Sequence, residues 1–245
     1  HIVRWLLRIA GALLFGGVVF FFILTRTEVG RDLLRQQLEA AFRATVNGQL
    51  HIGRLEGNVV HGLYARDVQL RDAAGRLVLT IDSVALRPSW RLLLERTLAF
   101  RSLELYNPLL LLHYDKGTWN LATLWRRPDQ PGPTSTWSFA VARLRVVGGA
   151  IQTRRTGDPP PIVAQQILQD FTEAKLDSLT LWASVDLRPG QQLVDLWQLS
   201  AHLTTPVNLP LHAAGQVIHQ ASRWQFSRLA LRVGTSWLAA DGEIQ

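Results

Sequence analysis

The chain has 245 residues, enough for one or two domains, and arginine carries almost all of its net charge of +7. The absence of cysteine excludes disulfides, thiolate catalysis and cysteine-based metal sites. The positive charge comes without a basic run or an aromatic RNA-binding motif, which argues against nucleic acid as a partner.

Neither end of the sequence has the features of a natural terminus. The chain contains no methionine, so His1 is not an initiator residue, and residues 241–245 stop within a strand-like pattern. We therefore expect a fragment that is cut at both ends, with a further C-terminal part missing.

The first predicted element is an apolar helix. From Ile9 to Leu24 no side chain is charged or strongly polar, and with the turn from Trp5 the helix is about 30 Å long, which matches one hydrocarbon core. The alternatives are a cleaved signal peptide, which has a shorter apolar run and small residues after it, and a buried core helix. We predict a single transmembrane anchor over residues 1–26, with a span that includes Trp5, Leu13, Phe20, Phe22 and Leu24.

The charges beside this span do not fix its orientation. Arg4 and Arg8 precede it, but Arg26, Arg31 and Arg35 follow closely, so the positive-inside rule favours neither side. The strand patterns that follow are typical of an extracytoplasmic protein, so we expect the C-terminal part to be translocated.

A second helix is predicted over residues 27–47, with Thr27 as its N-cap. Its apolar residues recur at steps of three and four and form one stripe. This stripe lies either on the bilayer interface or against the end of a hydrophobic sheet. We prefer the second position, because strand patterns begin directly after the helix.

From Gly48 to the end of the chain the apolar period is two, which predicts about a dozen strands over residues 48–245. The apolar phase changes after Ala65, which predicts a bulge near Arg66 and Asp67, and it changes again near Asp82. The cleanest alternation runs from Leu179 to Leu187. Five interruptions are expected: a helical connection at 88–94, an extended piece at 118–124, an exposed loop at 126–136, a break at Gly148-Gly149 and a short helix at 162–171.

Strands with one apolar face require a cover for that face. A second sheet supplies it in a closed sandwich, and lipid tails supply it if one long curved antiparallel sheet lines a groove. Periodicity is the same in both cases, and we favour the groove because the strands follow a membrane anchor without a closing signal. Its candidate lining residues are Leu50, Ile52, Leu63, Leu77, Leu79, Ile81, Leu103, Leu105, Leu144, Val146, Leu179, Leu181, Val185 and Leu187.

Several loose motifs occur in a fixed order along the whole sequence. They are the span with Thr25-Arg26-Thr27-Glu28-x-Gly30, Leu50-x-Ile52-Gly53-x-Leu55-Glu56-Gly57, Leu103-x-Leu105-x-Asn107-Pro108 with Gly117-x-Trp119-Asn120-Leu121, Leu144-x-Val146-x-Gly148-Gly149, and Leu229-x-Leu231-x-Val233-Gly234-Thr235-Ser236-x-Leu238 followed by Gly242. In this order they resemble the N-terminal part of the AsmA-like family.

This resemblance implies a single-pass anchor in the bacterial inner membrane and an elongated periplasmic β-taco with an apolar interior. It further implies phospholipid passage toward the outer membrane and support of outer-membrane protein assembly. The family also implies an outer-membrane β-barrel partner, reached through a C-terminal region that is absent from this sequence.

The sequence shows no pattern typical of catalysis. Its seven histidines are dispersed, without a His-Glu-x-x-His motif, and there is no Gly-x-Ser-x-Gly elbow or phosphate-binding glycine loop. We therefore expect no enzyme activity, no metal and no cofactor.

Three functions remain open. The first is a segment of a lipid conduit that binds membrane and phospholipid. The second is a scaffold or chaperone-like subunit with a closed β core that assists outer-membrane protein assembly. The third is an anchored enzyme whose active site lies beyond the fragment. The sequence gives neither the lipid nor the direction of transport.

Overall fold

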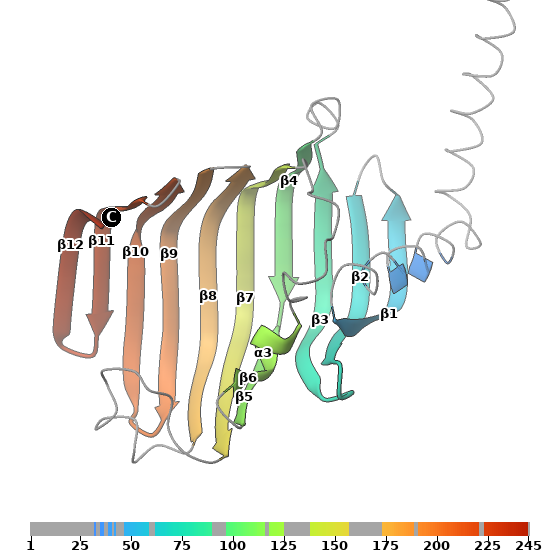
Figure 1. The fold of residues 1–245 in the computed structure, drawn as a ribbon, viewed down its shortest axis with the longest axis horizontal. Helices are drawn as coiled ribbons and strands as arrows, with labels where there is room; N and C mark the ends of the chain where they lie inside the picture. The colour runs from blue at the N-terminus through green and yellow to red at the C-terminus, as the bar shows by residue number, and fades with distance from the viewer. Residues whose placement is uncertain are drawn as a thin grey trace, which may run out of the picture.

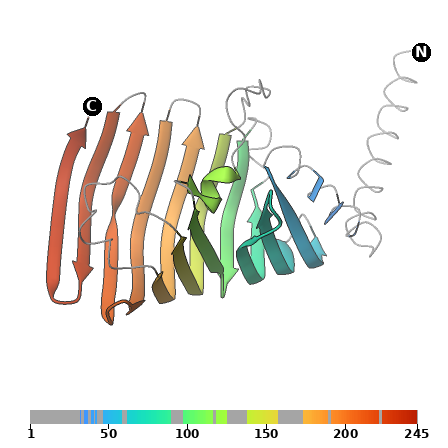
Figure 2. The same ribbon diagram turned by 60° about the horizontal axis from the view of Figure 1, so that its bottom comes forward.

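The computed structural model describes residues 32, 35–36, 39–40, 42, 47–58, 62–89, 97–115, 118–124, 138–156, 173–188, 191–220 and 223–244. Within these ranges the chain forms a large mixed sheet of twelve strands, which confirms the predicted mainly β class. Figures 1 and 2 show the strands as one curved layer from β1 to β12. No second sheet packs on this layer within the described ranges.

The described elements comprise twelve strands and one short helix. They are β1 (Gly48–Asn58), β2 (Gly62–Asp72), β3 (Leu77–Pro88), β4 (Thr97–Tyr106), β5 (Leu109–Asp115), β6 (Thr118–Trp119), α3 (Asn120–Thr123), β7 (Ser138–Thr156), β8 (Glu173–Arg188), β9 (Gln191–Thr205), β10 (Leu209–Gln220), β11 (Arg223–Val233) and β12 (Ser236–Ile244).

Several predicted elements fall on residues that the structure does not describe. The anchor over 1–26 lies outside the described residues, as do the loop at 126–136, the helix at 162–171 and residues 90–94 of the predicted helical connection. The six residues described between 32 and 42 are helical, within the range predicted for the second helix. In the described part of the chain, no helix has the length and apolar character needed to cross a membrane.

The expectation of an antiparallel sheet is wrong at one place. β7 pairs in parallel with both β4 and β5, while the other neighbours in the sheet are antiparallel. β4 and β5 lie end to end, because Asn107-Pro108 breaks one long strand between them, and both lie between β3 and β7. A parallel pair requires a crossover connection rather than a tight hairpin, and β6 and α3 are part of it.

Two local predictions also need correction. The extended piece expected at 118–124 is only the two residues of β6, after which α3 turns the chain, with Thr123 Oγ1 donating to Asn120 O at 2.6 Å. Gly148-Gly149 does not end a strand, because β7 continues through both residues.

The phase changes in the apolar pattern coincide with a line of left-handed residues across the sheet, which we call the crease. Its members are Asp67 in β2, Asn107 between β4 and β5, Gly148 in β7 and Ser178 in β8, with φ between 50° and 67°. Asn107 joins two neighbouring strands at this level: its Nδ2 donates to Asp82 Oδ2 at 2.9 Å and its backbone N to Val147 O at 2.8 Å. Asparagine, aspartate and glycine tolerate this conformation best.

The prediction of a bulge near Arg66 and Asp67 is wrong, and the left-handed residue Asp67 of the crease stands there instead. The register of β2 with β3 is unbroken there, since Arg66 pairs with Ser83 and Val68 with Ile81. A left-handed residue changes which face the following side chains occupy without adding an extra residue to the strand. The apolar spacing of three across Asp67 therefore keeps both halves of the strand on one face.

Gly148→Ala should destabilise the sheet more than Gly75→Ala. Both glycines have positive φ, at 67° and 78°, so an alanine costs each ~1–2 kcal/mol. A Cβ at Gly148 would also collide with Asn107 Oδ1, whereas nothing lies within 4 Å of one at Gly75. We expect at least ~1 kcal/mol of additional loss for Gly148→Ala, measured by urea unfolding, because Asn107 must leave Asp82. Equal losses for the two variants would contradict the crease as a point of close packing.

Candidate functional site

The strand register aligns apolar residues into rows that cross the sheet. Residues paired across neighbouring strands, parallel or antiparallel, lie on the same face of the sheet. One row takes a single residue from each of the ten strands β1-β2-β3-β4-β7-β8-β9-β10-β11-β12, which are neighbours in this order. Its members are Leu55, Ala65, Val84, Leu105, Val146, Leu181, Leu199, Ala213, Leu231 and Leu238.

A second row crosses the sheet on the other side of the crease and passes through β5 instead of β4. It consists of Leu50, Leu70, Leu79, Leu110, Ile151, Leu176, Leu203 and Leu209. We call the side of the sheet that carries these rows the apolar face.

The opposite side of the sheet is polar. In one example Glu104 pairs with Arg145, and Arg145 with Trp182, whose ring lies 5.0 Å from the Arg145 guanidinium carbon. The hydrogen bond that the Tyr106 hydroxyl donates to Glu104 Oε2, at 2.6 Å, raises the pKa of Tyr106 above its ordinary value. In this cluster charged and aromatic groups satisfy one another on the side opposite the first apolar row.

The register brings thirteen of the fourteen predicted lining residues to the apolar face. Leu77 is the exception, because a register shift between Leu70 and Arg71 sets it opposite Arg71. The thirteen are Leu50, Ile52, Leu63, Leu79, Ile81, Leu103, Leu105, Leu144, Val146, Leu179, Leu181, Val185 and Leu187.

The apolar face is covered at its β1 end and open at its β12 end. Ile52 and Leu55 are 6% and 8% exposed, whereas Leu238 of β12 is 60% exposed. Leu124, after α3, is buried at the start of β1, where Asn47 N donates to Leu124 O at 2.8 Å. The large apolar surface at the β12 end has no partner among the described residues.

Two helical side chains close the free edge of β1. Ile52 N donates to Glu39 Oε1 at 3.0 Å, and Arg35 Nη1 donates to Ile52 O at 3.1 Å. An edge strand presents unpaired backbone groups that invite a further strand, and Arg35 and Glu39, one helical turn apart, satisfy both groups of one residue. The sequence analysis did not predict this role for either residue; their opposite charges at i, i+4 were the available signal.

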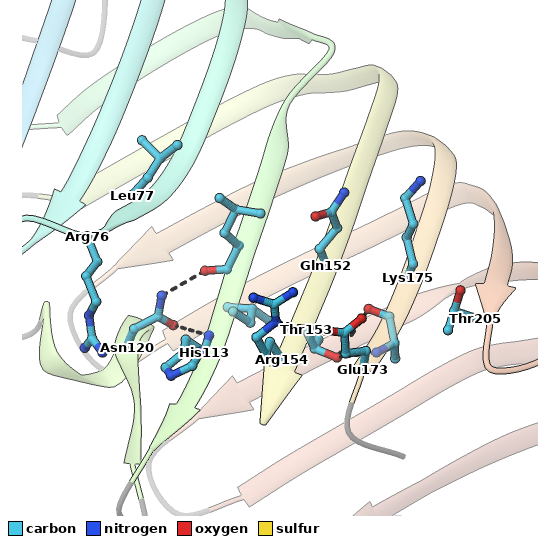
Figure 3. Close-up of a pocket in the computed structure, with 13 residues that line it drawn as sticks. Arg76, Leu77, His113, Asn120, Gln152, Thr153, Arg154, Glu173, Lys175 and Thr205 are labelled. Carbon is cyan, nitrogen blue, oxygen red and sulfur yellow. Dashed lines mark hydrogen bonds and ion pairs between the residues drawn. The ribbon is translucent and has the colours of Figure 1, made fainter. Parts of the chain in front are cut away.

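Asn120 satisfies outward backbone groups of β5 in the same way (Figure 3). Its Oδ1 accepts from His113 N at 3.0 Å, its Nδ2 donates to Leu111 O at 2.8 Å, and the residue is 3% exposed. β3 pairs with β5 only at Leu79 and Thr80, so beyond that point Asn120 takes the place of a neighbouring strand. No residue pattern around Asn120 predicted this role.

No group of three or more metal-ligating side chains lies together in the described part of the chain. The candidate site that the described geometry offers is the apolar face, with its covered and open ends.

Glu39→Ala should expose the edge of β1. The Ile52 amide would lose its acceptor, and we expect ~1–2 kcal/mol lower stability and faster hydrogen exchange at Ile52. Gln36→Ala is the matched control on the same helix, because Gln36 is exposed. Unchanged exchange at Ile52 in the Glu39 variant would contradict the edge closure.

No protein-family model matches the chain, and no curated protein matches it either.

Proposed function

We propose that this chain is a membrane-anchored segment of a lipid conduit, which carries phospholipid from the inner toward the outer membrane of a bacterial cell along the apolar face of the sheet. The process is binding and passage without turnover chemistry. The observation that supports it is the row of ten apolar residues from Leu55 to Leu238, because it forms one unbroken apolar path on a single-layer sheet.

The dimensions of the row suit acyl chains. Nine strand spacings of ~4.8 Å give a path of ~43 Å, longer than the ~30 Å of a bilayer core. Each methylene that lies on the row instead of in water is stabilised by ~0.8 kcal/mol. In this proposal the curvature at the crease turns the apolar face into a β-taco groove, and lipid tails supply the cover that a second sheet supplies in a sandwich.

The proposed orientation follows from the two ends of the sheet. The predicted anchor over 1–26 and the helix with Arg35 and Glu39 precede β1 in the sequence, and this helix contacts Ile52 of β1. The proposal therefore puts the β1 end at the inner membrane. The apolar face becomes more exposed toward β12, the end that points away. Most of the chain is then periplasmic, and lipid enters near β1.

The proposed family is the AsmA-like family, and its member that the sequence motifs resemble most is the translocation and assembly module subunit TamB. An outer-membrane β-barrel partner, reached through a region beyond this sequence, is part of the same proposal.

A scaffold that assists outer-membrane protein assembly is the second candidate. Exposed tryptophans favour it, because Trp197, Trp224 and Trp237 are 47%, 43% and 78% exposed among the described residues. Tryptophan is enriched at protein–protein interfaces. The closed core that we expected with this function requires a second sheet, whereas the described strands form one.

Leu181→Asp should reduce the phospholipid that the protein holds. The protein is extracted in mild detergent, the predicted span is removed at an engineered cleavage site, and the bound lipid is measured by mass spectrometry. We expect at least a tenfold loss, since an uncompensated carboxylate against acyl chains costs more than ~1.4 kcal/mol. Folding should change little, because Leu181 is only half-buried.

Thr180→Asp is the matched control, since Thr180 is also half-buried and is the neighbouring residue on the opposite side of β8. It should retain lipid. Equal lipid in the two variants, or none in the wild-type protein after removal of the span, would refute the conduit. Unfolding of Leu181→Asp alone would favour a closed core.

A further inference from the structure

A pocket of about 270 Å³ spans the last four strands of the sheet, β9 to β12 (Figure 1). Four short runs of residues line it: 197–199, 212–214, 230–232 and 237–238. Each run contains one member of the first apolar row, namely Leu199, Ala213, Leu231 or Leu238. The residues that flank these members belong to the opposite side of the sheet, because side chains alternate along a strand.

The pocket opens on the polar side of the sheet, behind the first apolar row. His212, Arg232 and Trp237 are paired across β10, β11 and β12 on that side. Their neighbours on the apolar face, Leu211 and Leu229, do not line the pocket. The pocket therefore lies on the side opposite to the proposed lipid path.

Two exposed tryptophans line the pocket at its two ends, Trp197 from β9 and Trp237 from β12. Trp197 Nε1 donates to Asp195 Oδ2 at 3.0 Å, which holds this indole on the polar side. Ala214 and Ala230 pair with each other on the two strands between, and their short side chains leave space. An aromatic ring that enters this space can pack against an indole edge to face.

The charge of the pocket wall comes from Arg232. Its Nε donates to Gly234 O at 3.2 Å, and within the described part of the chain its guanidinium forms no ion pair. The wall contains no aspartate or glutamate, and His212 is paired with Arg232 across the strands. A carboxylate of a ligand would therefore find guanidinium donors here, without an acidic residue in the wall to repel it.

We propose that this pocket is a docking site for a polypeptide partner that presents an aromatic side chain and a carboxylate on one side of an extended segment. The ring lies over Ala214 and Ala230, between the two tryptophans, and the carboxylate contacts Arg232. Side chains two residues apart in an extended segment point the same way, so the matching sequence is acidic-x-aromatic.

The size and composition of the pocket favour a polypeptide over a free aromatic acid. Its volume of about 270 Å³ is below the ~300–1,000 Å³ of most small-molecule sites and suits individual side chains. Tryptophan is enriched at protein–protein interfaces. Because the pocket lies behind the proposed lipid path, this docking site does not depend on the conduit function.

The test titrates the full chain in detergent micelles with the capped peptide Gly-Asp-Ser-Phe-Gly and follows the indole N–H signals of Trp197 and Trp237 by NMR. A second peptide has asparagine in place of aspartate. Arg232→Gln removes the cation, and Arg228→Gln is the matched control, because Arg228 is an exposed arginine of the same strand that does not line the pocket. Ala230→Leu fills the space between the tryptophans at an exposed position, so folding should be retained.

We expect both indole signals to shift with the aspartate peptide. Arg232→Gln should bind this peptide about threefold more weakly, as expected for one exposed charge-assisted contact, and should bind the asparagine peptide as the wild-type protein does. Ala230→Leu should abolish the shifts with both peptides, and Arg228→Gln should behave as the wild-type protein. Bound phospholipid should be the same in Arg232→Gln as in the wild-type protein, which separates this site from the conduit.

Three results would overturn the proposal. The first is the absence of any shift at Trp197 and Trp237 with either peptide at millimolar concentration. The second is equal affinity of the wild-type protein and Arg232→Gln for the aspartate peptide, which would remove the carboxylate from the recognition. The third is phenylpropionate that binds the wild-type protein and not Ala230→Leu while neither peptide binds, which would identify a site for a soluble aromatic acid.

Discussion

The fold depends on a constraint that a single-layer sheet cannot satisfy alone: an apolar face needs a partner that excludes water. Here the register concentrates the apolar residues into rows, so this requirement falls on one side of the sheet. At β1 the chain supplies part of the cover itself through Leu124 and the turn of α3. From there to β12 the rows continue without a cover from the described residues, and Leu238 is 60% exposed. The proposed occupant of this surface must therefore be long, apolar and tolerant of sliding.

Side chains satisfy the outward backbone groups of two strands in this sheet. Arg35 and Glu39 satisfy the outward backbone groups of Ile52, which removes the template for a further strand at β1. Asn120 protects the inner edge of β5 with the same chemistry, an uncharged amide in place of an ion pair. Strand addition is therefore blocked at Ile52 of β1 and at residues 111–113 of β5.

The sequence predicts those parts of the structure that depend on local alternation. The alternation from Leu179 to Leu187 correctly predicts β8. The phase change at Asp67 marks the position of the crease, and the cause of this phase change is a left-handed residue rather than a bulge. The parallel pairing of β7 depends on contacts between distant segments, which alternation does not encode. The position of Leu77 was not predictable from alternation either, because a register shift between β2 and β3 sets it opposite Arg71 and outside the apolar rows. Asn120 was read as part of an extended piece, and its role appears only once β3 and β5 have separated.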